Sequence, residues 1–246
     1  MRYNNKVGKV YINKQGLKME IIEYFGCNNC AVQFEDGVIL KNIQYGHIKE
    51  GVVKNPNHPS VYGVGYLGVG KYTNKTHPEI YKKWAGILQR SYSDKYQKNY
   101  QTYKNCFVIE DWKCFQNFAK WYEDNWKPYM QGWELDKDIF VKGNIFYSQE
   151  TCCFVPHEIN SLFVKSNKVR GKYPIGVTKA DKKYKARFHK KEEYVDLGRF
   201  NTPEEAFQAY KTAKEKYIKE VADEWKTLIS IECHHAMYNY KIEITD

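Results

Sequence analysis

The sequence predicts an α+β protein made of three modules. Two observations lead to this prediction: short β-branched runs with alternating apolar and polar residues lie near both ends of the chain, and apolar residues with helical spacing lie between them. We place the modules at residues 1–70, 71–168 and 169–246. We expect a small β-barrel-like module, then a ββα module preceded by helices, then a three-stranded sheet packed on one helix.

The first module, residues 1–70, has the pattern of a small antiparallel barrel or curled sheet. The runs MEIIEYF, AVQFED and VILKNIQ are short and rich in β-branched residues, and Asp36-Gly37 between the last two is typical of a type I′ hairpin turn. A loop rich in Gly, Pro and Asn follows them. No motif here indicates a chemical function, and a protein partner is the candidate ligand of residues 1–70.

The part of the second module before the ββα segment has helical spacing. His77-Pro78 opens one expected helix, and a second begins at about Asp111. Each carries an apolar stripe of the kind that faces a core more often than it stacks on bases. The stripes are Ile80, Trp84, Ile87 and Leu88 in the first helix, and Trp112, Phe115, Phe118, Ala119, Tyr122 and Trp126 in the second.

Cysteine usage and hydropathy indicate a reducing compartment. No apolar run approaches the roughly 20 residues that span a bilayer, and the amino terminus lacks the apolar core of a signal peptide. The seven cysteines are an odd number without the spacing of a disulfide framework. We therefore expect a cytoplasmic protein with reduced thiols and no membrane partner. Cys27 and Cys30 have half the spacing of a zinc site; we interpret them as small thiols beside a polar turn, with a metal site as the alternative.

The stretch ELDKDIFVKGNIFYSQETCCFVPHEIN, residues 134–160, predicts strand, loop, strand and a short helix that Pro156 begins. Asp136 and Asp138 flank a lysine near its start, and Asn160 lies at its end. Metal-dependent cleavage of a phosphodiester needs a divalent ion at the phosphate, a base for the attacking water and stabilisation of the leaving group. Carboxylate and amide oxygens on such a hairpin and helix can hold the ion.

These residues, and with the preceding tryptophan-rich helices residues 77–163, resemble the HNH (ββα-metal) nucleases, most closely their homing-endonuclease branch. The resemblance implies a phage or mobile-element protein that acts on double-stranded DNA in a bacterial host cell. It also implies Mg²⁺ or another divalent cation on Asp136 and Asn160, with Asp138 as a second carboxylate that binds the ion directly or through water.

The chain departs from this family at two positions. Lys137 occupies the place of the general-base histidine, and Thr151 that of a structural asparagine. An ammonium with a pKa near 10.4 is a poor base, so Lys137 would neutralise developing charge instead. His157, one helical turn before Asn160, is the other catalytic candidate. Three interpretations stay open: an atypical nuclease that nicks DNA, a catalytically inactive DNA-binding regulator or anti-defence inhibitor of a DNA-handling complex, and a charged hairpin without a catalytic role.

The third module opens with a basic connector, residues 165–174, followed by three strands, PIGVTK, KYKARFH and EYVDLGRF. Thr202 then supplies a helix N-cap, Pro203 the first helical position and Glu205 the capping-box glutamate. We expect this helix to reach Trp225. Its expected inward residues are Ala206, Tyr210, Ala213 and Tyr217.

Positive charge is concentrated in one segment. The chain has 39 Lys and Arg against 29 Asp and Glu, and residues 165–200 alone hold twelve against four. In KYKARFH, alternation places Lys185, Arg187 and His189 on one side and apolar residues on the side that the helix covers. A basic sheet face can enter a DNA major groove, and a solvated strand face is the alternative. The candidate DNA-binding residues are Lys168, Arg170, Lys172, Lys179, Lys182, Lys183, Lys185, Arg187, His189 and Arg199.

The motifs Gly176-Val177, YKARF, DLGRF and TPEEAFQAY resemble the ethylene-response-factor (Apetala-type) DNA-binding domain over about residues 172–226. The same domain occurs in endonucleases of phages and mobile elements. The resemblance implies a three-stranded sheet that lies in the major groove. Thr178 and Ala180 replace arginines of that family and Asp196 replaces a tryptophan, so the family's base preference does not carry over.

Overall fold

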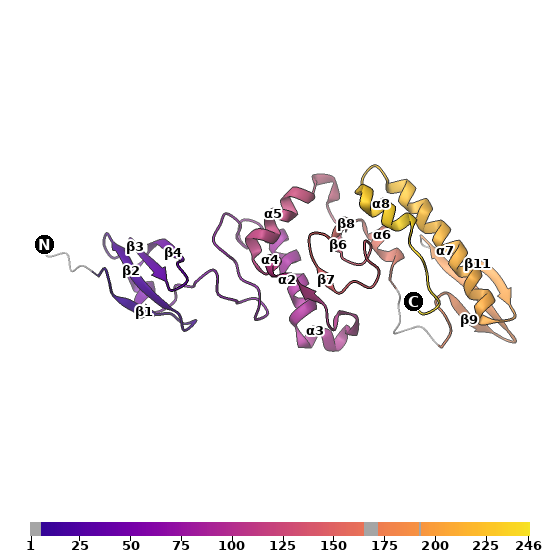
Figure 1. Cartoon of the computed structure of the whole chain (residues 1–246), viewed down its shortest axis with the longest axis horizontal. Helices are drawn as coiled ribbons and strands as arrows, with labels where there is room; N and C mark the ends of the chain where they lie inside the picture. Colours follow the sequence, from indigo (N-terminus) through magenta and orange to yellow (C-terminus); the bar gives the residue numbers. More distant parts are fainter. Residues whose placement is uncertain (1–5, 165–171, 192) are drawn as a thin grey trace. The chain divides into compact units, whose positions relative to one another are not determined.

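The computed structural model describes residues 6–164, 172–191 and 193–246 (Figure 1). The chain divides into two compact units, residues 1–125 and 126–246. Both units contain helices and strands, arranged with several small sheets, which confirms the prediction of a mixed α and β protein. The first unit holds the expected β module and the helices after it. The second holds the expected ββα segment and the C-terminal sheet.

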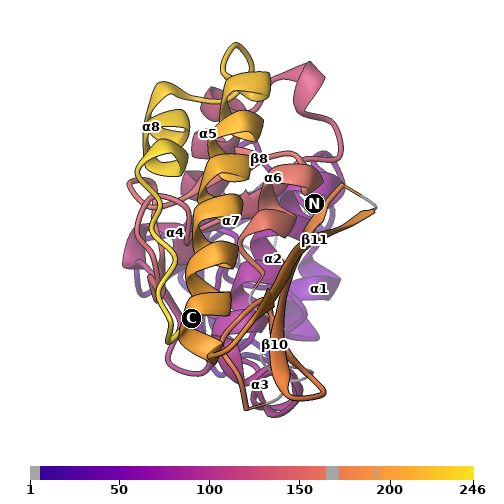
Figure 2. The same ribbon diagram turned by 90° about the vertical axis from the view of Figure 1, so that its right-hand side faces the viewer.

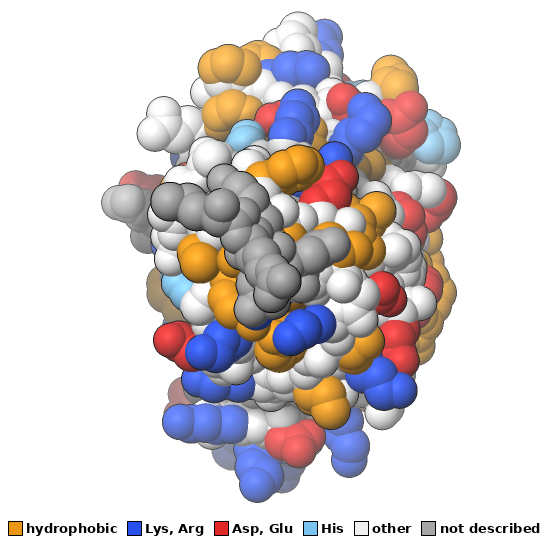
Figure 3. Space-filling model, turned by 90° about the vertical axis from the view of Figure 1, so that its left-hand side faces the viewer, with side chains coloured by type: hydrophobic (Ala, Val, Ile, Leu, Met, Phe, Trp, Pro, Cys, Tyr) orange, Lys and Arg blue, Asp and Glu red, His pale blue; other side chains and the backbone are white. Residues whose placement is uncertain are grey.

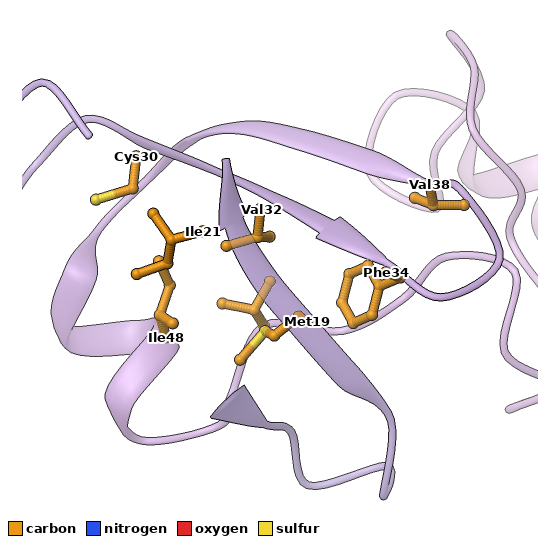
Figure 4. Close-up of a cluster of buried hydrophobic side chains, with 8 residues drawn as sticks. Met19, Ile21, Cys30, Val32, Phe34, Val38 and Ile48 are labelled. Atoms are coloured by element: carbon orange, nitrogen blue, oxygen red, sulfur yellow. The ribbon is translucent and has the colours of Figure 1, made fainter. Parts of the chain in front are cut away.

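Alternating apolar residues build the N-terminal sheet. Its four strands pair antiparallel in chain order, and a short helix follows them. Met19, Ile21, Val32 and Phe34 form a buried core together with Ile48 of that helix (Figure 4). The polar residues between them are exposed, as expected for a sheet with one buried side. The elements are β1 (Val10–Ile12), β2 (Lys18–Tyr24), β3 (Cys30–Phe34), β4 (Ile39–Ile43) and α1 (Tyr45–Lys49).

The turn between β3 and β4 differs from the predicted type I′ turn. That turn requires a positive φ at two successive residues, and of the Asp36-Gly37 pair only Gly37 has one, at +85°. The N–H of Gly37 donates to the carbonyl of Phe34 at 3.0 Å, and that of Phe34 donates to Val38 at 2.9 Å, so the loop is longer than two residues. The Asp36 carboxylate accepts the N–H of Val38 and two asparagine amides, which stabilises the longer turn.

The helices of the first unit agree only partly with the predicted pair. The first is confirmed, and Trp84 on its buried side donates a hydrogen bond from Nε1 to the carbonyl of Trp112 at 2.7 Å. The second is wrong as a continuous helix, because Cys114 is extended and forms a parallel bridge with Tyr66. The elements are α2 (Pro78–Tyr92), α3 (Asp94–Asn99), η1 (Gln101–Tyr103), β5 (Phe107–Val108), α4 (Glu110–Lys113) and α5 (Phe115–Asn125).

The second unit begins with a strand, loop, strand and helix in the predicted order. The two outer strands are short and pair antiparallel, with Asp136 opposite Cys153 and Glu134 opposite Val155. Pro156 is the N-cap of the helix and not its first residue, because its ψ of 156° is extended. The elements are η2 (Pro128–Met130), β6 (Glu134–Asp136), β7 (Phe146–Tyr147), β8 (Cys153–Val155) and α6 (His157–Leu162).

A three-stranded antiparallel sheet and a long helix follow. Figure 2 shows the helix α7 alongside the sheet, with α8 on its other side. Ala186 and Phe188 of the central strand are buried against α7, where the Phe188 and Tyr217 rings are 5.7 Å apart. The predicted capping box of Thr202 and Glu205 is confirmed. The elements are β9 (Val177–Ala180), β10 (Lys183–Lys190), β11 (Glu193–Phe200), α7 (Pro203–Trp225) and α8 (Ile231–Tyr238), with sheet order β11-β10-β9.

The buried side of α7 is less apolar than predicted. Ala206, Tyr210 and Tyr217 are buried as expected, but Ala213 is only half-buried and its neighbour Lys214 is buried in its place. Helical spacing allows either residue to fill the position between Tyr210 and Tyr217, so packing decides the choice. Within the described residues, no helix is both long and apolar enough to cross a membrane.

Candidate functional site

The side of the β9–β11 sheet that faces away from α7 is rich in cations. Lys185, Arg187 and His189 alternate along β10 with the buried residues that contact the helix. On β11, Tyr194 lies opposite His189, and Arg199 opposite Lys185. The prediction that alternation separates a basic side from an apolar side is therefore confirmed. We call this exposed side the basic face; it consists of Lys183, Lys185, Arg187, His189, Tyr194, Asp196 and Arg199.

A β-bulge places Arg199 on the basic face. Strict alternation from Asp196 would turn Arg199 toward the helix. The register shifts here, so that Asp196 is opposite Arg187 while Gly198 is opposite Ala186. Gly198 has a φ of +106°, which glycine adopts readily and which lets the strand gain the extra residue. The bulge is what returns the Arg199 side chain to the exposed side.

Neighbouring side chains orient the cations of the basic face. Nζ of Lys185 lies 2.6 Å from Oδ2 of Asp196, and this ion pair lowers the pKa of the Asp196 carboxyl. The Arg187 guanidinium lies 4.7 Å from the centre of the Tyr194 ring, a cation–π arrangement. The His189 ring packs against the same tyrosine ring, with the two ring centroids 3.7 Å apart. The face therefore presents oriented groups, not a set of freely rotating lysines.

The remaining predicted DNA-binding residues lie elsewhere. Lys179 is opposite Tyr184, and its ammonium is 3.9 Å from the centre of that ring. Because Tyr184 belongs to the helix side of β10, Lys179 does not lie on the basic face. Lys182 is exposed in the β9–β10 turn, and Lys172 lies 5.5 Å from the Tyr173 ring. Lys168 and Arg170 are outside the described residues.

Charges on the first unit are distributed differently. In Figure 3, which looks onto the N-terminal sheet, basic, acidic and apolar side chains are interspersed. Two lysines of this sheet form ion pairs: Lys18 with Glu35 at 3.3 Å, and Lys41 with Glu23 at 4.0 Å. The concentrated charge predicted from the sequence therefore lies in the second unit.

On the ββα hairpin, Asp136 faces its own loop. Its Oδ1 accepts the backbone N–H groups of Asp138 and Ile139 at 2.7 and 2.9 Å, which forms a tight turn at the end of β6. Burial raises the pKa of the Asp136 carboxyl, although these two hydrogen bonds oppose the shift. These two hydrogen bonds involve Oδ1 alone and orient the carboxylate within the turn.

Lys137 is buried in the same loop. Its side chain is only 8% exposed, and Nζ lies 2.9 Å from both carboxylate oxygens of Asp138. Nζ also donates to the carbonyl of Asn144, whose side-chain amide donates back to the Lys137 carbonyl at 2.8 Å. All three ammonium protons can therefore be used inside the loop. This position suits a structural lysine better than one that meets a phosphate.

Asn160 meets a carboxylate that the sequence did not single out. Its Nδ2 donates to Oε2 of Glu134, and Oε1 of Glu134 lies 2.7 Å from Nδ1 of His157. His157 and Asn160 are three residues apart on α6 and so share a face, which packs near β6. The sequence could have indicated Glu134, because it lies two residues before Asp136 and strand alternation puts both side chains on one side of β6.

The three expected metal ligands have different hydrogen-bond partners. Asp136 binds backbone N–H groups, Asp138 binds Lys137, and Asn160 binds Glu134. In the described part of the chain, no three His, Cys, Asp or Glu side chains are placed to hold a metal ion. The two aspartates and the asparagine are therefore engaged within the protein, and the cation that the sequence resemblance implies stays a prediction.

The cysteines also lack a metal arrangement in the described residues. Cys27 is exposed, whereas Cys30 is buried and its thiol donates to the carbonyl of Gly26 at 3.4 Å. Cys153 lies beside Cys233 of α8, and the hydrogen bond between the two thiols, together with burial, raises the pKa of the Cys153 thiol well above its usual value. The buried thiols act as small core side chains.

The chain matches no protein-family model, no curated protein and no solved structure.

Proposed function

We propose that this chain binds double-stranded DNA through the basic face of its β9–β11 sheet. The observation that carries the proposal is the placement of four cations, Lys183, Lys185, Arg187 and Arg199, on one exposed sheet surface. They outnumber the two carboxylates that pair with them, Asp196 and Asp181. A two- or three-stranded sheet fits the width of the major groove, where arginine donates to guanine and lysine meets guanine or phosphate. Affinity would then depend strongly on phosphate neutralisation and hence on salt.

The pairing of other lysines in this module supports the same surface. Lys190 and Lys191, at the end of β10, form ion pairs with Glu220 and Glu224 of α7 at 3.0 and 3.8 Å. Their charges are offset within the protein, whereas the basic face keeps an excess of positive charge that a polyanion can neutralise. The distribution favours a DNA-binding surface over a uniformly solvated strand.

Titration of a fluorescent duplex at several salt concentrations tests the proposal. Arg187→Ala should weaken binding by about 1–3 kcal/mol, because it removes a guanidinium from the basic face. Lys190→Ala is the matched control: it removes one positive charge that is already paired with Glu220, and affinity should stay within about twofold. Equal effects of the two substitutions, or salt-independent binding, would contradict the proposal.

For the hairpin, we propose DNA binding without metal-dependent cleavage as the role that its geometry favours. The buried Lys137 and the different hydrogen-bond partners of Asp136 and Asn160 support this choice over a nuclease centre. The chain would then act as a regulator or as an inhibitor of a DNA-handling complex, as a protein that occupies DNA can do.

DNA nicking is the second candidate, and one contact favours it. The Glu134 carboxylate holds Nδ1 of the exposed His157, so the other ring nitrogen is oriented toward solvent and could accept a proton from water. Supercoiled plasmid with Mg²⁺ or Mn²⁺, compared with chelator, separates the two candidates. Nicking that His157→Ala abolishes would support the second candidate. Undamaged plasmid, at protein concentrations that saturate the DNA, would support binding alone.

A further inference from the structure

An arginine and an aspartate lie directly opposite each other on the basic face but do not pair. Arg187 of β10 and Asp196 of β11 are register partners, and both are exposed. The guanidinium lies over the Tyr194 ring, and the carboxylate lies against Lys185. A donor and an acceptor therefore project from adjacent positions of the basic face, and backbones paired in this way are about 4.5–5.5 Å apart.

The carboxylate is held in a defined position. Oδ1 of Asp196 accepts the N–H of Gly198 at 3.0 Å, across the β-bulge, and Oδ2 pairs with Lys185 at 2.6 Å. Both contacts keep the group ionised, and Lys185 contributes most to the lowered pKa. Each carboxylate oxygen still has a lone pair for one further donor. The side chain is 58% exposed, so a base edge can reach it.

A carboxylate on a surface that binds DNA is unfavourable unless it accepts a hydrogen bond from a base. Near phosphates it is repelled, so it lowers the affinity for any sequence that offers it no hydrogen-bond donor. In the major groove the donors are the amino groups of cytosine and adenine, and carboxylates typically accept from cytosine N4. An arginine beside it matches O6 and N7 of guanine.

We infer that Asp196 determines the sequence specificity of this surface, with Arg187 binding a guanine and Asp196 binding the amino group of a cytosine that lies next to it in the major groove. The inference rests on the proposed DNA-binding function and adds the bases that are recognised. Lys185 and the N–H of Gly198 are the groups that position the carboxylate.

Selection from a randomised duplex library tests it with the full chain. Wild-type protein should enrich sites that contain an invariant guanine and a neighbouring cytosine. Asp196→Asn keeps the size of the side chain and the oxygen that accepts from Gly198, but it removes the negative charge and adds a donor. It should lose about tenfold in discrimination at the cytosine position and gain affinity for unrelated duplexes.

Asp181→Asn is the matched control. Asp181 lies in the β9–β10 turn, is 89% exposed and pairs with Arg199 at 3.8 Å, so the same change of charge occurs beside the basic face but away from the Arg187–Asp196 pair. Asparagine also tolerates the φ of +54° found there. This variant should keep the wild-type sequence preference. Circular dichroism of each variant confirms that it is folded.

A base analogue tests directly whether Asp196 accepts a hydrogen bond from the cytosine amino group. Replacing the selected cytosine by 2-pyrimidinone removes only its amino group, and wild-type affinity should fall by about tenfold while that of Asp196→Asn changes little. Binding with no cytosine preference, or with the same preference in Asp196→Asn, would overturn the inference and leave the proposed function standing. Failure of the wild type to bind any duplex would overturn the proposed function itself.

Discussion

Lys137 and Asn144 hold each other across the loop between β6 and β7. The Lys137 ammonium donates to the carbonyl of Asn144, and the Asn144 amide donates to the carbonyl of Lys137 at 2.8 Å. The same amide group also bonds Phe146, through Nδ2 to its carbonyl and through Oδ1 from its N–H. Two buried polar side chains therefore supply the hydrogen bonds that a loop without regular structure would otherwise lack.

This relationship predicts a structural role for Lys137. Lys137→Met should lower the free energy of unfolding by about 2 kcal/mol, since it leaves the Asn144 carbonyl and the Asp138 carboxylate without their partner. Lys226→Met, an exchange at an exposed position, should change it by less than about 0.5 kcal/mol. Urea denaturation of the three proteins measures both. A Lys137→Met protein as stable as the wild type would show that the loop does not depend on this lysine.

The buried Lys214 predicts a stabilising substitution. Burial lowers its pKa to about 8, so the folded state disfavours the charged form that the unfolded chain carries. The shift corresponds to about 3 kcal/mol below pH 8, and the cost disappears as pH rises toward the unfolded pKa near 10.5. Lys214→Met should therefore be more stable at pH 7, with a smaller advantage at pH 9.5. Thermal unfolding at both pH values, compared with wild type, measures the difference; an advantage that does not shrink would argue against a buried ammonium.

The stability of a variant at Asp136 should depend on pH in the opposite direction to that of Lys214→Met. Its carboxyl pKa is raised by burial, so the ionised form costs stability at neutral pH and the neutral form, below pH 4, does not. Asp136→Asn keeps an oxygen to accept the N–H groups of Asp138 and Ile139. It should match or exceed the stability of the wild type at pH 7 and lose that advantage as pH falls. Denaturation at pH 7 and pH 4 checks the sign, and a marked loss of stability at pH 7 would indicate that the charge itself is needed.

Close packing of Gly176 against α7 should make a larger residue at this position destabilising. A methyl group on Gly176 would overlap the ring of Tyr210, and the residue also has a φ of +76°. Gly132→Ala is a matched control, because that glycine has a φ of +84° but open space around it. Gly132→Ala should cost about 1 kcal/mol from backbone conformation alone, and Gly176→Ala about 2–3 kcal/mol in total. Denaturant unfolding of both variants tests this; equal costs would show that Tyr210 moves aside freely.

Local patterns in the sequence were enough to predict several elements. The N-cap threonine and glutamate of α7 satisfy backbone groups within four residues, so Thr202 and Glu205 mark the helix start without any tertiary information. Alternation in β10 also depends only on strand geometry, which is why Arg187 and Phe188 were assigned to opposite sides. Elements that contain their own stabilising contacts are those that a single sequence determines.

Features that depend on distant partners were decided by the tertiary structure. The helix expected after Asp111 is interrupted because Tyr66, far away in the sequence, pairs with Cys114. Arg199 reaches the basic face only through the bulge at Gly198. Asn160 donates to Glu134, which the sequence did not single out, while Oδ1 of Asp136 accepts backbone N–H groups of its own loop. Composition and spacing place a side chain on an element, but the packing of elements decides which polar group it meets, because each donor and acceptor goes to the partner that packing brings within reach.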